Sequence, residues 1–192
     1  MNRAKSACLL PRSWNAWNDG WLIRVPRIEG IVPTGLAGSY RGENVNEAPG
    51  AVKTGTSTVG ITFKGGVVVG ADHRATMGHF VANKSVQKLF KIGDNLALTT
   101  AGLVGHAQSL ARTLAAEVSL FELRRGDAMT VRGAATLTAN ILSGRPHWVQ
   151  LLIVGVDNEG GSVYSIDSAG GSIPDSYCAT GSGSPYMYGV LE

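Results

Sequence analysis

The chain has 192 residues, of which 44% are hydrophobic and 16% charged, which fits one domain with an apolar core and excludes a disordered chain. Its longest apolar runs fall far short of the ~20 residues that cross a bilayer, so a membrane span is excluded. The formal net charge of +3 arises in residues 1–55, which hold seven Lys or Arg and four Asp or Glu; the neutral remainder has scattered bases, which argues against nucleic-acid binding.

Residues 1–55 are predicted to form a poorly ordered leader. They hold three of the four tryptophans and four of the seven prolines, and they show neither a helical nor an alternating period. The composition changes over residues 51–55, so the predicted domain is 56–192. The apolar run at residues 7–10 is shorter than the ~7 to 15 residues of a secretory signal, and we therefore expect a cytoplasmic protein.

Strand signals begin directly after this leader. Thr58–Phe63 is rich in β-branched residues, and a Lys-Gly-Gly turn leads back into Val67–Ala71, which predicts a hairpin. A second extended pair is expected between Phe80–Ile92 and Asn95–Thr100. Both pairs would lie in sheets.

The period then changes to that of helices. Apolar residues recur at spacings of three and four from Val104 until Gly126 stops the helix, and a second helix is predicted over Val131–Leu142. Strands return at Val149–Val156 and Ser162–Ile166. This order predicts stacked sheets with the two helices over one outer face. Ser184 and Pro185 then begin a helix close to the last residue, so we expect a fragment truncated within a helix.

The junction between leader and first strand carries the chemical signal. Glycine precedes threonine here, and Gly55 without a Cβ can adopt strained backbone angles that expose its carbonyl to the Thr56 hydroxyl. Self-cleavage would make Thr56 a new N-terminus, whose α-amine titrates near ~7.7 to 8.0 and can serve as a base. Nucleophile and base would then share one residue. The alternative is that Thr56 only begins an edge strand.

Eight collinear stretches of residues 54–192 carry a family signal. They are TGTSTVG (54–60), ADHRATMG (71–78), QKLFKI (87–92), TTAGLVGHAQ (99–108), ELRRG (122–126), VQLLIVGVD (149–157), YSIDSAGGS (164–172) and ATGSGSPYMYGVLE (179–192). Together they resemble the proteasome β-subunit family, particularly its archaeal type. The resemblance implies an α+β fold, the four-layer αββα sandwich of N-terminal nucleophile hydrolases, here truncated at the C-terminus.

The resemblance implies a catalytic set. It makes Thr56 the nucleophile, Lys88 the lysine beside it and Asp72 the carboxylate that pairs with this lysine. A fixed ammonium near Thr56 would favour its neutral amine and stabilise a developing alkoxide. Arg74 is expected to brace the site by charge-assisted hydrogen bonds. In isolation, Lys88 and Asp72 would more often be surface residues, and the matching stretches argue against that alternative.

Two further positions carry over from the family. Gly102 resembles the residue whose backbone N–H receives the oxyanion, although it could also simply precede a helix. Ser184 matches a serine close to the threonine amine, where it would help to relay a proton. The surrounding glycines fit neither a dinucleotide-binding nor a P-loop spacing, so nucleotide binding is not expected. The positions that line the primary pocket are all uncharged, which favours cleavage after apolar residues: Ala75, Val86, Thr100 and Val104.

The predicted function is that of a threonine endopeptidase subunit of the proteasome core, made as a zymogen and cut between Gly55 and Thr56. The resemblance implies heptameric rings of β subunits, α-type ring subunits, an ATP-driven unfoldase and unfolded polypeptide substrates. One alternative is a catalytically silent ring subunit, and another is a small-molecule amidase of the same fold. The retained Gly55-Thr56 junction with Asp72 and Lys88 argues against the silent subunit.

Two departures from the family bear on these expectations. The leader is long for the archaeal type, which suggests that Met1 is not the true start. The family also places another Asp and another Ser of the catalytic network beyond residue 192, so the chain as written is expected to be inactive unless they are supplied. Cys8 and Cys178 are too few for a disulfide framework and have no metal-ligand spacing, and we expect neither a metal nor an organic cofactor.

Overall fold

A computed structural model describes residues 55–77, 80–145 and 147–192. The chain divides into Met1–Asn44 and Val45–Glu192, and all described residues belong to the second unit. The predicted leader therefore lies outside the described residues, apart from Gly55 at its end. Within the described residues, no helix has both the length and the apolar character needed to cross a membrane.

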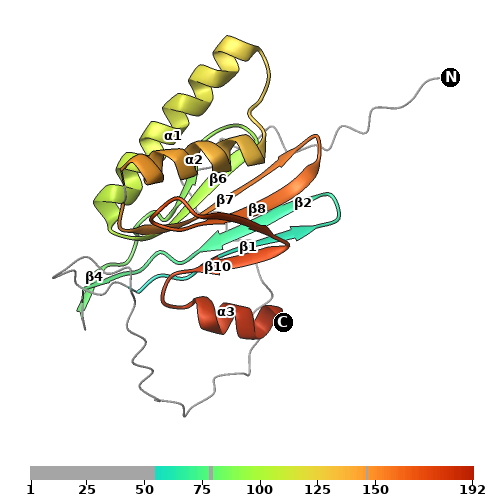
Figure 1. The fold of residues 1–192 in the computed structure, drawn as a ribbon. Coiled ribbons are helices and arrows are strands. Elements are labelled where there is room, and N and C mark those ends of the chain that lie inside the picture. The colour runs from blue at the N-terminus through green and yellow to red at the C-terminus, as the bar shows by residue number, and fades with distance from the viewer. Residues whose placement is uncertain (1–54, 78–79, 146) are drawn as a thin grey trace. The chain divides into compact units, whose positions relative to one another are not determined.

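The first sheet has three antiparallel strands in the order β10-β1-β2 (Figure 1). Strands β1 (Thr58–Phe63) and β2 (Gly66–Ala71) form the predicted hairpin, with Thr58 opposite Ala71. Strand β10 (Tyr177–Thr180) pairs with the other edge of β1, where Thr58 lies opposite Thr180. The start of β1 and the end of β10 are therefore neighbours, although more than a hundred residues separate them in sequence.

The second sheet has five antiparallel strands, in sequence order across the sheet. Its strands are β5 (Leu89–Lys91), β6 (Leu96–Gly102), β7 (Val149–Asp157), β8 (Gly160–Ile166) and β9 (Ser172–Asp175). The predicted strands at β6, β7 and β8 are confirmed, and central β7 is almost wholly buried, as its continuous apolar sequence requires.

The predicted pair between Phe80–Ile92 and Asn95–Thr100 is confirmed only in its second half. Strand β5 pairs with β6, but β4 (Phe80–Asn83) pairs instead with β3 (Ala75–Met77). The extended run is interrupted because the Asn83 side chain accepts a hydrogen bond from the Ser85 N–H and turns the chain. A bulge between Ala75 and Thr76 shifts the β3–β4 register.

Three helices complete the described residues. Helix α1 (Val104–Arg125) ends where Gly126 adopts a left-handed conformation with φ of 72°, so the predicted stop is confirmed. Helix α2 (Val131–Gly144) begins where the Thr130 side chain accepts a hydrogen bond from the Gly133 N–H. Helix α3 (Ser184–Leu191) begins at the predicted residue, but Gly183 is its N-cap and no side chain caps it.

The elements pack in layers around two apolar clusters. Helices α1 and α2 cover one face of the five-stranded sheet, and Leu98, Leu114 and Ile153 are buried between them. A smaller cluster joins the other face to the three-stranded sheet, through residues such as Leu152, Val163 and Cys178. Figure 1 shows α3 beside β10, away from α1 and α2. The described residues thus contain both sheets of the predicted sandwich; its complete fourth layer and its truncation stay predictions.

Candidate active site

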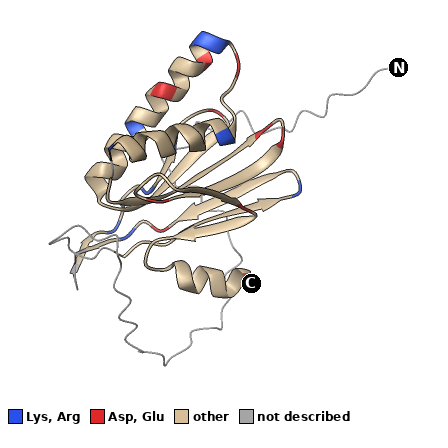
Figure 2. Cartoon of the chain, in the orientation of Figure 1, with Lys and Arg blue, Asp and Glu red and all other residues tan. Residues whose placement is uncertain are grey.

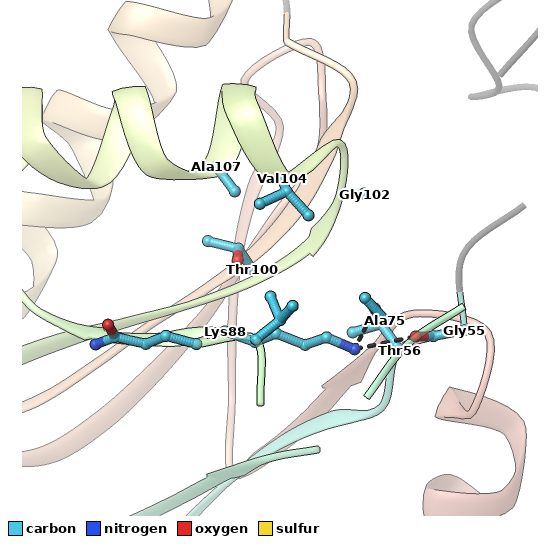
Figure 3. A pocket seen from close by; sticks show the side chains of 10 residues that line it. Gly55, Thr56, Ala75, Lys88, Thr100, Gly102, Val104 and Ala107 are labelled. Atoms are coloured by element: carbon cyan, nitrogen blue, oxygen red, sulfur yellow. Dashed lines mark hydrogen bonds between the residues drawn. The ribbon is translucent and has the colours of Figure 1, made fainter. Parts of the chain in front are cut away.

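Thr56 lies two residues before β1 and is only 6% exposed. Its hydroxyl oxygen Oγ1 is 2.9 Å from the ammonium nitrogen Nζ of Lys88. The same nitrogen is 3.0 Å from the carbonyl oxygen of Gly55, the residue just before the predicted cleavage point. Figure 3 shows the Lys88 side chain extended toward Thr56 and Gly55. The lysine therefore contacts both the candidate nucleophile and the carbonyl that this nucleophile would attack.

Three further contacts hold the Lys88 ammonium in place. It donates to Asp72 Oδ1 at 2.9 Å, to Asp72 Oδ2 at 3.0 Å and to the Arg74 carbonyl oxygen at 2.6 Å. A buried ammonium needs such partners, because it has lost the hydration that stabilises its charge in water. The Lys88 side chain is 7% exposed, whereas that of Asp72 is 34% exposed. The pair thus reaches from the surface to the buried Thr56.

Asp72 is kept ionised by the main chain around it. The Ser57 N–H donates to its Oδ1 at 2.9 Å, and the Arg74 N–H donates to its Oδ2 at 2.9 Å. Burial by itself favours the neutral carboxyl, but the hydrogen bonds from Ser57, Lys88 and Arg74 outweigh it and lower the pKa of Asp72 below its ordinary value. The Asp72 carboxylate thus forms an ion pair with the Lys88 ammonium.

Ser182, and not Ser184, faces the main-chain nitrogen of Thr56. The Thr56 N–H donates to Ser182 Oγ at 3.2 Å, while the Gly183 N–H donates to the Thr56 carbonyl at 3.0 Å. Ser184 instead donates its own N–H to the Gly181 carbonyl and opens α3. The serine beside the Thr56 nitrogen is therefore Ser182, two residues before the predicted Ser184.

The glycines on either side of Ser182 are the feature of the sequence that could have indicated its place beside Thr56. Gly181 has a φ of 88°, and a Cβ there would collide with the main chain of Thr56. A Cβ on Gly183 would likewise collide with the Ser57 side chain. Both glycines are thus needed for the chain to approach Thr56 closely, and the serine between them is brought against the nitrogen.

A pocket opens beside Thr56, and it contains all four of the predicted lining residues. Figure 3 shows Thr100 and Val104 on the side of the pocket away from Gly55. Of the described residues that line it, only Lys88, at its Thr56 end, is charged. Gln87 and Ala107 line it too and were not predicted; Ala107 is one helical turn after Val104 on α1. The described residues of the lining are Gly55, Thr56, Ala75, Val86, Gln87, Lys88, Thr100, Gly102, Val104 and Ala107.

Comparison with known proteins shows the family of this chain. A family model described as proteasome subunit matches residues 52–192. The chain belongs to this family. Archaeal relatives named proteasome subunit beta match most of it. The protein of Methanosphaera stadtmanae is 51% identical over 138 residues, which cover 72% of this chain and 67% of the relative. That of Archaeoglobus fulgidus is 53% identical over 142 residues, covering 72% and 67%.

Gly102 in this proteasome subunit lies at the end of β6 and lines the pocket with Thr56. Its φ of 126° is a conformation that other residues rarely adopt, and a Cβ there would collide with the Trp148 carbonyl oxygen. The family resemblance explains this glycine by the oxyanion that its N–H is expected to receive. The structure adds a local reason, because the chain must bend next to Trp148 before α1 begins.

Arg74 contributes to the site of this proteasome subunit through its main chain. Its N–H binds Asp72 and its carbonyl binds Lys88, while the residue itself is exposed. The predicted bracing by the charged side chain is therefore corrected to bracing by the backbone.

Figure 2 shows Lys and Arg dispersed among Asp and Glu over helices and loops of the described residues, as the sequence indicated.

Proposed function

We propose that this chain is a threonine endopeptidase subunit of the proteasome core particle, which cleaves itself between Gly55 and Thr56 and then degrades unfolded polypeptides. One observation carries the proposal: the Lys88 ammonium lies within hydrogen-bond distance of both Thr56 Oγ1 and the Gly55 carbonyl oxygen. A catalytically silent ring subunit, which is the alternative, would not need this arrangement.

Self-cleavage would proceed as an acyl shift from nitrogen to oxygen. Thr56 Oγ bonds to the Gly55 carbonyl carbon and loses its proton, and Lys88 stabilises the negative charge that develops on the carbonyl oxygen. The bond from carbon to the Thr56 nitrogen then breaks, the nitrogen takes up a proton, and an ester remains. Water hydrolyses this ester, which leaves a carboxylate on Gly55 and a free α-amine on Thr56.

The mature Thr56 would then cleave other chains. Its α-amine, with an ordinary pKa of ~7.7 to 8.0, accepts the proton of the hydroxyl as Oγ attacks a substrate carbonyl. The ammonium of Lys88 favours the neutral amine and stabilises the alkoxide, and Ser182 is placed to exchange protons with the amine. Gly102 is proposed as the donor of the oxyanion hydrogen bond.

The pocket favours apolar side chains of the substrate. Ala75, Val86, Thr100 and Val104 line it without charge, and the Lys88 ammonium at its Thr56 end is already paired with Asp72. A basic side chain would therefore lose hydration there without gaining a partner, and an acidic one would have to compete with Asp72 for Lys88. As partners we propose other β subunits in heptameric rings, α-type ring subunits and an ATP-driven unfoldase, with the cytoplasm as the compartment. Enclosure in such rings would keep folded proteins away from Thr56.

Mass spectrometry of the assembled particle tests the proposal. We expect the chain to begin at Thr56, and we expect Thr56→Ala to retain its leader and to hydrolyse no peptide. Thr113→Ala, at an exposed threonine of α1, is the matched control and should mature normally. A particle that assembles with the leader of the unsubstituted chain uncut would support the silent subunit instead.

A further inference from the structure

Thr76 contacts the residue before the cleavage point, although the proposed mechanism gives it no part. Its hydroxyl oxygen accepts a hydrogen bond from the Gly55 N–H at 2.7 Å. The two residues are 21 positions apart, so only the folded chain joins them. Gly55 is thus held at both ends, by Thr76 at its N–H and by Lys88 at its carbonyl oxygen.

Thr76 lies in β3 next to an irregularity of the β3–β4 pair. Ala75 is paired with Asn83 and Thr76 with Val81, so the extra residue in this register is Ala82 of β4. Ala75 lines the pocket, Thr76 contacts Gly55, and Arg74 just before them contacts Lys88. Three consecutive residues of one short segment serve the site.

The same contact limits the size of residue 55. A Cβ built on Gly55 would lie 3.2 Å from Thr76 Oγ1, closer than ordinary van der Waals contact allows. Lack of space is therefore one reason for glycine at this position, beside the strained backbone angles that the sequence leads us to expect.

We propose that Thr76 is a positioning residue for self-cleavage: its hydroxyl fixes the Gly55 N–H and, by its closeness, restricts residue 55 to glycine. The inference rests on the proposed function. With its N–H and carbonyl oxygen both held, Gly55 has little freedom to turn its carbonyl carbon away from Thr56 Oγ. Such pre-orientation raises the fraction of molecules that are ready to react.

The hydrogen-bond part is tested by the rate of leader release. In the full chain assembled with its ring partners, mass spectrometry follows cleavage after Gly55. Thr76→Val keeps the shape of the side chain but removes the acceptor, and we expect cleavage to slow about ten-fold. Thr76→Ser keeps the hydroxyl and should cleave nearly as fast as the parent. Equal rates for Val and Thr at position 76 would overturn the inference.

The steric part is tested by a double-mutant cycle. We expect Gly55→Ala to slow cleavage strongly in the parent and clearly less in a Thr76→Ala background, where the added methyl has room. A general loss of fold caused by Thr76→Ala cancels in this comparison. An equal effect of Gly55→Ala in both backgrounds overturns the steric role of Thr76 but leaves the proposed function intact. If the unsubstituted chain is not cut after Gly55, the proposed function falls as well.

Discussion

The ammonium of Lys88 has more acceptors than it can serve at once. Five oxygens of Gly55, Thr56, Asp72 and Arg74 lie within 3.0 Å of Nζ, whereas an ammonium has three N–H groups. Its hydrogen bonds must therefore be shared or exchanged among them. In the proposed mechanism, this would allow the same group to stabilise negative charge first on the Gly55 carbonyl oxygen and then on the Thr56 hydroxyl oxygen.

Lys88→Met should abolish most of the activity without unfolding the chain. Methionine fills similar space but carries no charge, and the loss of one such electrostatic partner costs about 100-fold to 1,000-fold in rate. We expect both leader cleavage and peptide hydrolysis to fall by at least that factor. Lys64→Met, in the exposed turn after β1, is the control, and equal activity in the two variants would contradict the role of Lys88.

Asp72 should make the uncut protein sensitive to acid. Its pKa is lowered below 3.8 in the folded chain, so its contribution to the free energy of unfolding is present above pH ~4 and is lost as the pH falls through the folded value. The difference in stability between Thr56→Ala and Thr56→Ala/Asp72→Asn should therefore shrink as the pH falls from 6 to ~3.

Urea unfolding at a series of pH values measures this difference. Asp94→Asn is the control, because that carboxylate is 96% exposed. The free energies of unfolding of Thr56→Ala and Thr56→Ala/Asp72→Asn are the two values compared. If their difference stays constant down to pH ~3, the Asp72 carboxylate gains nothing from its hydrogen bonds in the folded state.

At the scale of elements, buried hydroxyls join the strands beneath the site. Thr58 on β1 lies 2.6 Å from Thr180 on β10, oxygen to oxygen, and Thr99 on β6 donates to Thr58 at 3.1 Å. All three side chains are at most 5% exposed. Thr56 lies two residues before Thr58, and Ser182 lies two residues after Thr180. These bonds therefore help to fix Thr56 and Ser182 relative to each other.

Thr58→Val should destabilise the chain more than Thr99→Val does. Valine at 58 leaves the hydroxyls of both Thr99 and Thr180 without this partner, whereas valine at 99 leaves the bond between Thr58 and Thr180 intact. We expect costs of about 2 and 1 kcal/mol in the free energy of unfolding. Thr136→Val on the exposed face of α2 is the control; the reverse order of the two costs would contradict the network.

Two glycines near the start of α1 should respond oppositely to alanine. Gly102→Ala forces a side chain into a left-handed conformation against Trp148, which costs about 1–3 kcal/mol or shifts the loop. Gly105→Ala lies within the helix with open space around it, and should stabilise by about 0.5–1 kcal/mol. Thermal unfolding of both variants checks this, and a neutral Gly102→Ala would refute the steric argument.

At the scale of the whole molecule, the site exists only when both sheets are in place. Thr56 and Ser182 belong to the ends of the three-stranded sheet, whereas Lys88 precedes β5 and Gly102 ends β6 in the five-stranded sheet. No pair of these segments forms the site by itself. Self-cleavage should therefore report on folding as well as on chemistry.

Leu114→Ala separates these two requirements. Leu114 is fully buried between α1 and the five-stranded sheet, and its truncation costs about 2–5 kcal/mol. We expect leader cleavage to be lost at 37 °C and recovered at lower temperature, as the folded fraction recovers. Lys88→Met should stay inactive at both temperatures. A Leu114→Ala chain that is folded but still uncut in the cold would contradict this separation.

Much of this protein could be read from local patterns. The β1–β2 hairpin, both long helices and the buried strand β7 follow from apolar periods and turn residues that lie within a few positions of one another. Thr56 was found because the leader and the first strand meet at a Gly-Thr step, and Lys88 and Asp72 were found through the family resemblance. The pairing of β4 was missed, because an Asn side chain turning the chain at Ser85 has no periodic signal.

Amino-acid order alone determined the long helices, most of the longer strands, the family and the candidate nucleophile, because each depends on neighbouring residues or on collinear motifs. Tertiary structure alone decided that Ser182 rather than Ser184 faces Thr56, that Arg74 acts through its backbone and that Thr76 holds Gly55. These contacts join residues 126, 14 and 21 positions apart. They depend on the left-handed conformation of Gly181 and on the packing of distant strands, and neither has a signal in the local order of residues.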